Sequence, residues 1–194
     1  MKQIRRRLLS GLLLLGCVLA AGCSSGPGPE SAHGPAGSET NDALKFDVPA
    51  GWVEESPSSS SRKLQYRLPR VEQDSEDAEV VVFYFAGGGG TPQANVDRWV
   101  GQFQTPDGKP VSDKATTSHK DVNGIHVTIV DVSGTYFSSM GPMQGAGEPK
   151  PGYRMLGIIA ETASGPWFIK FTGPERTVAR WKPSFHSFVD SMKQ

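Results

Sequence analysis

EVVVFYFA, residues 79–86, is apolar at every position after the first glutamate. A strand with apolar side chains on both faces must be covered on both faces, as central strands of a sheet are. Four glycines, Gly87, Gly88, Gly89 and Gly90, follow directly, and Thr91-Pro92 comes next. Thr as N-cap and Pro as first helical residue are typical of a helix start. The sequence therefore predicts a central strand followed by a helix.

The predicted helix carries an apolar stripe. Val96, Trp99, Val100 and Phe103 recur at the spacing of one helix face, and Pro106 ends the pattern. Asn95, Arg98 and Gln102 share another face. We expect this face to be solvated, or to form a polar surface in which the Arg98 guanidinium binds an anion.

Strand patterns lie on both sides of this centre. Alternation predicts a strand over residues 44–48 and another through Leu64, Tyr66 and Leu68. Asn123-Gly124 predicts a hairpin between residues 112–121 and 125–136. Ser164-Gly165 predicts a second hairpin, joining residues 153–162 and 166–172.

The chain ends in a second helical pattern, with Pro183 at a kink or at the start of its second half. Its apolar residues are Val178, Trp181, Phe185, Phe188 and Met192. Together these patterns predict one α+β domain over residues 43–194. Its core is a largely antiparallel sheet of about seven strands, with the central and C-terminal helices packed on it.

FDVPAGW at residues 46–52, the central helix and FHSFVDSMK at residues 185–193 resemble the PsbP-like fold. Small bacterial lipoproteins share this layout. The resemblance covers most of residues 43–194 but transfers no functional residue. It implies a binding or assembly module without enzymatic activity.

The first 22 residues have the pattern of a lipoprotein signal peptide. MKQIRRR is basic, and the apolar stretch LLSGLLLLGCVLA is too short to span a bilayer. Leu19, Ala20, Ala21 and Gly22 then precede Cys23, which resembles the lipobox of bacterial lipoproteins. The resemblance implies cleavage before Cys23, lipidation of its thiol and a membrane anchor. Leu14-Leu15-Gly16-Cys17 is a competing match, but cleavage there would leave Val18-Leu19 at the new terminus.

Residues 23–42 lack large apolar side chains and are interpreted as the lipidated cysteine and a flexible tether. Ser24 after the cysteine favours the outer membrane, facing the periplasm, over the inner membrane. Cys17 and Cys23 are the two cysteines of the chain, so the mature domain would have neither a disulfide nor a thiol nucleophile.

The net charge of zero includes Lys2, Arg5, Arg6 and Arg7 of the signal peptide, so residues 24–194 carry a net charge of −4. An acidic product argues against general binding to nucleic acid. The expected partners are therefore the membrane, through the lipid, and an envelope protein.

Two segments are candidate binding sites. Gly87–Gly90 lies between a strand and a helix, where backbone N–H groups can hold an anion, with Arg98 as helper. The loop over residues 138–152 is a candidate partner-binding flap that contains Met140 and Met143. Two methionines are too few for a copper site.

No cofactor, metal site or catalytic constellation is predicted from the sequence. The chain lacks a Gly-x-Ser-x-Gly elbow, and His119, His126 and His186 have no ligand spacing. The sequence therefore favours a non-enzymatic, lipid-anchored binding or assembly module in the cell envelope. The alternative is a periplasmic lipoprotein that binds a small ligand or an anion through Gly87–Gly90 and Arg98.

Overall fold

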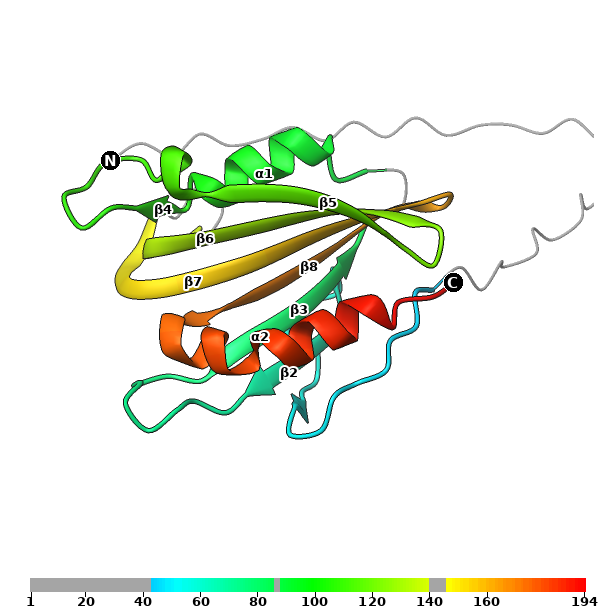
Figure 1. Cartoon of the computed structure of the whole chain (residues 1–194), viewed down its shortest axis with the longest axis horizontal. Coiled ribbons are helices and arrows are strands. Elements are labelled where there is room, and N and C mark those ends of the chain that lie inside the picture. Colours follow the sequence, from blue (N-terminus) through cyan, green and yellow to red (C-terminus); the bar gives the residue numbers. More distant parts are fainter. Residues whose placement is uncertain (1–42, 86–87, 140–145) are drawn as a thin grey trace, which may run out of the picture. The chain divides into compact units, whose positions relative to one another are not determined.

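The computed structural model describes residues 43–85, 88–139 and 146–194, which all belong to one compact unit, Thr40–Gln194 (Figure 1). The helices and strands of these residues are, in chain order, β1 (Val53–Glu54), β2 (Arg62–Leu68), β3 (Ala78–Tyr84), α1 (Pro92–Val100), β4 (Phe103–Gln104), the short 3-10 helix η1 (Ser112–Lys114), β5 (Thr116–Val122), β6 (Ile125–Ser139), β7 (Ala146–Thr162), β8 (Gly165–Pro174) and α2 (Glu175–Asp190).

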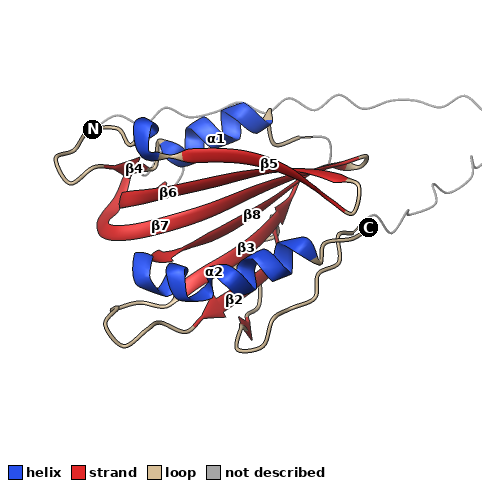
Figure 2. Cartoon of the chain, in the orientation of Figure 1, coloured by secondary structure: helices blue, strands red, loops and turns tan. Residues whose placement is uncertain are grey.

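The strands form one antiparallel sheet in the order β1-β2-β3-β8-β7-β6-β4, with β5 also paired to β6 (Figure 2). The predicted α+β class is confirmed. At the strand expected over residues 79–86, Ala78–Tyr84 forms β3, which lies between β2 and β8 as expected of a central strand.

The two helices cover opposite faces of the sheet. Side chains alternate between the faces of each strand, so neighbours such as Ile158 and Ile159 enter different apolar clusters. Ile158 joins Val178 and Phe185 of α2, whereas Ile159 joins Trp99 of α1. Helix α1 packs mainly on β6 and β7, whereas α2 packs on β7 and β8.

Helix α1 begins as the sequence predicts. The Thr91 hydroxyl accepts a hydrogen bond from the Ala94 N–H at 3.2 Å, and Pro92 is the first helical residue. The helix ends at Val100, so Phe103 joins the same apolar cluster from β4 rather than from the helix. Nine residues are too few to cover this face of an eight-stranded sheet.

Both predicted hairpins form, β5–β6 around Asn123-Gly124 and β7–β8 around Ser164-Gly165. Asn123 and Gly124 have φ values of 50° and 81°, the left-handed conformation that such a turn requires. Helix α2 is continuous through Pro183. Neither helix of the described residues is long and apolar enough to cross a membrane.

Two expected elements are wrong. Residues 44–48 make an isolated bridge, Lys45 to Lys193, rather than a strand, and Leu44 and Phe46 join the apolar cluster that contains α2. Phe46 stacks on Phe188 with ring centroids 4.4 Å apart. The long loop expected over residues 138–152 is largely β-structure, because β6 extends to Ser139 and β7 begins at Ala146.

Residues 43–194 hold their own core. The buried apolar side chains of both clusters lie between Leu44 and Met192. A unit with its own core is expected to fold without the preceding residues.

Candidate functional site

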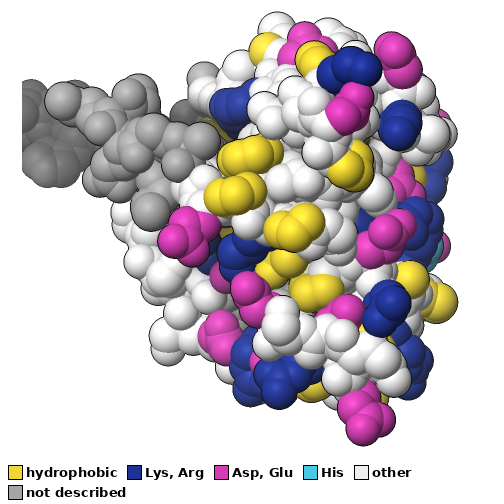
Figure 3. Space-filling view, turned by 90° about the vertical axis from the view of Figure 1, so that its left-hand side faces the viewer, with side chains coloured by type: hydrophobic (Ala, Val, Ile, Leu, Met, Phe, Trp, Pro, Cys, Tyr) yellow, Lys and Arg dark blue, Asp and Glu magenta, His cyan; other side chains and the backbone are white. Residues whose placement is uncertain are grey.

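The face of the sheet that carries α1 is hollowed beside the helix. A groove of about 510 Å³ lies there, lined by side chains from β2, β3, β6, β7 and β8 and by Gln102 after α1. We call it the Lys170 groove; its polar and aromatic lining includes Arg62, Glu76, Asp77, Glu79, Phe83, Gln102, Tyr136, Lys150, Tyr153, Lys170 and Thr172. Figure 3 views the end of the molecule where β3 begins and β8 ends, and it shows hydrophobic side chains there with acidic and basic ones beside them.

Acidic residues at the mouth of the groove are neutralised by neighbours. Glu76 accepts hydrogen bonds from the Lys150 amine and, at 2.6 Å, from the Tyr153 hydroxyl. The hydrogen bond from Lys150 is the main cause that holds the pKa of Glu76 below its usual value. Asp77 pairs with Arg67 at 3.0 Å. Both carboxylates are therefore engaged in contacts that stabilise the fold.

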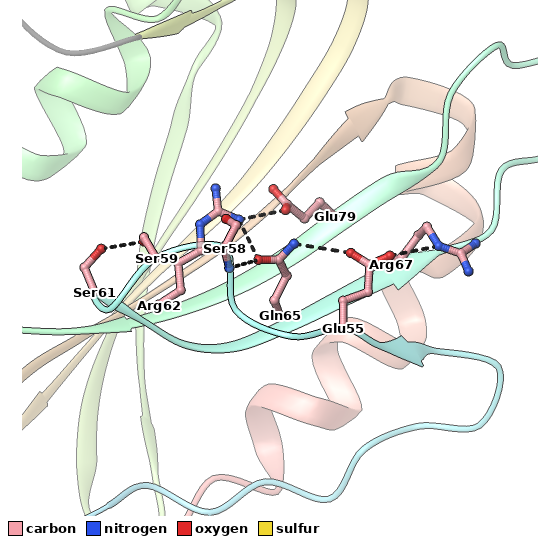
Figure 4. Close-up of polar contacts among 8 residues, drawn as sticks. All are labelled: Glu55, Ser58, Ser59, Ser61, Arg62, Gln65, Arg67 and Glu79. Carbon is pink, nitrogen blue, oxygen red and sulfur yellow. Dashed lines mark hydrogen bonds and ion pairs between the residues drawn. The ribbon is translucent and has the colours of Figure 1, made fainter.

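The β2 side of the groove is closed by the polar network drawn in Figure 4. Gln65, which is only 8% exposed, accepts hydrogen bonds from the Ser58 N–H and from Arg62, and it donates to Glu55. Arg62 also pairs with Glu79 at 2.7 Å. The network holds the segment before β2 against the sheet and neutralises both Arg62 and Glu79.

Lys170 differs from these charged groups because it has no counter-charge of its own. It lies on β8, partly buried, and its amine donates to the Gln102 amide oxygen at 2.9 Å. The amine also lies 5.8 Å from the centre of the Tyr136 ring, a cation–π contact. No carboxylate of the described residues forms an ion pair with it, since Glu79 is bonded to Arg62.

Burial lowers the pKa of Lys170 to about 8, and the neighbouring charge of Arg98 contributes to this shift. Lys170 is therefore mostly protonated at neutral pH, in a position where solvent stabilises the ammonium poorly. Strongly perturbed ionisable groups in a groove are candidates for functional residues.

A smaller cleft of about 180 Å³ adjoins the groove and shares Phe83, Gln102 and Lys170 with it. We call it the aromatic cleft; it is lined by Phe83, Phe85, Arg98, Trp99, Gln102, Phe168 and Lys170. The Phe85 side chain is 39% exposed, unusual for so large an apolar group. The apolar run that forms β3 therefore ends in Phe83 and Phe85, and the rings of both residues line the aromatic cleft.

Arg98 is held at this cleft by a chain of hydrogen bonds. It donates to the Asn95 side-chain oxygen, and Asn95 donates to the carbonyl oxygens of Gly89 and Thr91 at 2.7 and 2.9 Å. Gly89 has φ of 103°, and a Cβ there would lie 2.7 Å from the Phe168 ring. Glycine is required at this position both by conformation and by close approach.

The structure keeps the residues of the expected polar stripe close together but buries one of them. The expectation that Asn95 is part of an exposed surface is wrong, because Asn95 is 1% exposed and hydrogen-bonds to the glycine loop. Arg98 and Gln102 both line the aromatic cleft. Gly88, Gly89 and Gly90 form the loop that Asn95 fastens, whereas Cys23, Gly87, Met140 and Met143 lie outside the described residues.

Sequence reasoning missed Lys170. The available signal was the strand pattern, in which Trp167, Ile169 and Phe171 form one apolar face. A lysine between Phe168 and Thr172 on the other face of a central strand is unusual in a buried sheet. The four other strands that line the groove, β2, β3, β6 and β7, were not predictable as its neighbours from local patterns.

A second cleft, of about 530 Å³, lies between α1, β4 and η1. Asp97 is the one charged residue in its lining, which is otherwise apolar or neutral and polar. Among the described residues, no three His, Cys, Asp or Glu side chains are grouped closely enough to hold a metal ion.

No protein-family model and no curated protein matches this chain. Several solved structures, including the following two, have a similar chain course. The protein of unknown function PA94 from Pseudomonas aeruginosa is 11% identical, with a TM-score of 0.45, and the match covers 78% of this chain and 96% of that one. Cyanobacterial PsbP (CyanoP) from Synechocystis sp. PCC 6803 is 14% identical, with a TM-score of 0.43, and the match covers 82% and 99%. With TM-scores below 0.5, neither likeness carries an argument about family or function.

Proposed function

We propose that this protein is a lipid-anchored, non-enzymatic binding module of the bacterial cell envelope. Lipid on Cys23 would hold it at the membrane, and residues 24–42 would tether the domain. The domain would bind its partner or ligand on the face of the sheet that carries α1.

The observation that carries the binding role is Lys170, a charged amine that pairs with no carboxylate of the described residues and lies in a groove of about 510 Å³. Holding an ammonium away from water without a carboxylate partner is unfavourable for folding. An apolar residue would fit the strand better, so the lysine is best explained by something that it binds.

The state of the carboxylates supports binding over catalysis. Glu76 and Glu79 in the groove are engaged by Lys150 and Arg62, so neither is free to act as a general base. The groove offers instead the Lys170 ammonium and the rings of Phe83 and Tyr136, which are groups that recognise a ligand.

Substitution of the two cysteines tests the anchor. The Cys23→Ser chain should be recovered in the soluble fraction and should lose its lipid mass, because no acyl chain can be attached. Cys17→Ser is the matched control and should remain lipidated in the membrane fraction. Membrane retention of Cys23→Ser, with loss of retention in Cys17→Ser, would instead assign the anchor to Cys17.

Location is tested separately, in intact cells. Fractionation should place the wild-type protein with the outer membrane, and added protease should degrade it only after the outer membrane is permeabilised. Recovery with the inner membrane, or cleavage in intact cells, would contradict the proposed location.

A further inference from the structure

We propose that the aromatic cleft binds a small aromatic anion whose charged group lies between Arg98 and Lys170. Its ring would lie against the side chains of Phe83, Phe85 and Phe168. This inference rests on the proposed binding role of the face that carries α1, and it adds the chemical class of the ligand.

The first support is the pair of cations. Arg98 and Lys170 line the same cleft, and the charge of Arg98 helps to lower the pKa of Lys170. Their side chains bond to the neutral amides of Asn95 and Gln102, and no carboxylate of the described residues pairs with either. One anionic group between them would supply the missing counter-charge through charge-assisted hydrogen bonds.

The second support is that Arg98 is positioned before any ligand arrives. Asn95 holds the guanidinium and is itself fixed by the carbonyl groups of Gly89 and Thr91. A guanidinium has five N–H donors in a planar fork, so one bond to Asn95 leaves donors for a carboxylate or sulfonate. A fixed donor loses less side-chain entropy on binding.

The third support is the aromatic lining. Phe85 lies 6.3 Å from Phe83 and 5.9 Å from Phe168, centre to centre, so three rings surround the cleft. Trp99 contacts Phe168 edge-on at 6.2 Å. Aromatic rings gain by offset or edge contacts with another ring, and the partly exposed Phe85 would be covered by such a ligand.

This lining distinguishes an aromatic anion from other ligands. Inorganic phosphate would satisfy the cations but leave the rings exposed. A neutral aromatic compound would cover the rings but leave both charges unpaired. Only a ligand with both groups uses the whole cleft, which at about 180 Å³ is suited to a ring rather than a long acyl chain.

The test uses two dyes with the same ring system on the polypeptide of residues 24–194, which contains the complete core. Anilinonaphthalene sulfonate carries the anionic group, and N-phenylnaphthylamine lacks it. Titration followed by fluorescence should show saturable binding of one sulfonate dye per chain, at least about tenfold tighter than the neutral dye. Inorganic phosphate at the same concentration should not displace the dye.

Four variants locate the site. Arg98→Gln and Lys170→Met should each weaken binding of the sulfonate dye by about tenfold or more. Arg180→Gln on α2 and Lys63→Met on β2 remove a charge on exposed residues outside the cleft and should bind as the wild type does. Urea unfolding curves confirm that each variant is folded at the titration temperature.

The inference is overturned if the sulfonate dye fails to saturate, binds no better than the neutral dye, or binds equally well to Lys170→Met and the wild type. Such a result does not bear on the proposed lipid anchor, because the Cys23→Ser experiment tests the anchor independently. Conversely, saturable binding that depends on Arg98 and Lys170 would support the proposed ligand site even if Cys23 proved not to be lipidated.

Discussion

Lys170 lies at a position of β8 where an apolar side chain would suit the sheet better than an ammonium group. Its pKa is lowered to about 8 by burial and by the charge of Arg98, against about 10.5 in an unfolded chain. Between these two pH values the unfolded chain binds more protons than the folded one, so this group makes stability rise with pH across the window. Below pH 8 the charged form lowers the stability of the folded state.

We therefore expect Lys170→Met to be more stable than the wild type at pH 7, by about 1–2 kcal/mol. The advantage should shrink as pH rises from 8 towards 10, because the folded wild-type lysine loses its proton over this range and no longer holds a buried charge. Tyr136 and Tyr153 have raised pKa values and keep their protons over this range. Urea unfolding at pH 7, 8.5 and 9.5 measures both effects, and a variant that is less stable at pH 7 would show that the lysine serves the fold.

Of the two cations in the cleft, Arg98 could be recognised as a candidate from the sequence and Lys170 could not. Arg98 was recognisable as a candidate because it follows a glycine-rich turn on a predicted helix. Lys170 is 72 positions later in the chain, and only the pairing of β8 with β3 and β7 brings it to the same cleft. The helical pattern predicts that Asn95 lies on a solvated or surface-binding face, whereas its buried side chain donates hydrogen bonds to carbonyl groups of a tight loop.

At the level of the elements, Gly157 of β7 allows α1 to pack closely on the sheet. A Cβ at Gly157 of β7 would lie 2.6 Å from two ring atoms of Trp99, so the absence of a side chain lets the indole lie directly on the strand. Gly157 pairs with Val130 on one side and Lys170 on the other, so the backbone has little room to yield.

We expect Gly157→Ala to lower the free energy of unfolding by about 1–3 kcal/mol, because the ring and α1 must shift outward. In a Trp99→Leu background the same substitution should cost much less, since the smaller side chain leaves room for the methyl group. Urea unfolding of the four proteins completes the cycle. Equal costs in both backgrounds would show that contact with Trp99 is not the cause.

Elements with strong local signals were predictable from the sequence. The start of α1 at Thr91-Pro92 and the two hairpin turns depend on one or two residues whose conformations favour those structures. The conformation of residues 44–48 was not predictable, because an alternating pattern shows only that one side of the segment is buried. Phe46 is buried by stacking on Phe188, without strand pairing. The β6–β7 extension was missed because glycine and proline in residues 146–152 favour a loop.

Over the whole domain, the unequal length of the two helices determines where a ligand can bind. Helix α2 has 16 residues and completes the core on its face, whereas α1 has nine and packs mainly on β6 and β7. The part of the second face beside α1 contains the Lys170 groove and the aromatic cleft. The two helices and most of the longer strands were predictable from the sequence, but the open surface was not, because it depends on how far α1 extends.

On the proposed function, this face of the domain binds a natural ligand through Arg98 and Lys170. Native mass spectrometry tests it directly, with residues 24–194 mixed with small molecules extracted from the envelope of the cells that express the protein. We predict that the wild type gains the mass of one acidic aromatic compound and that the Arg98→Gln/Lys170→Met variant remains bare. The same added mass on both proteins, or none on the wild type, would contradict the account.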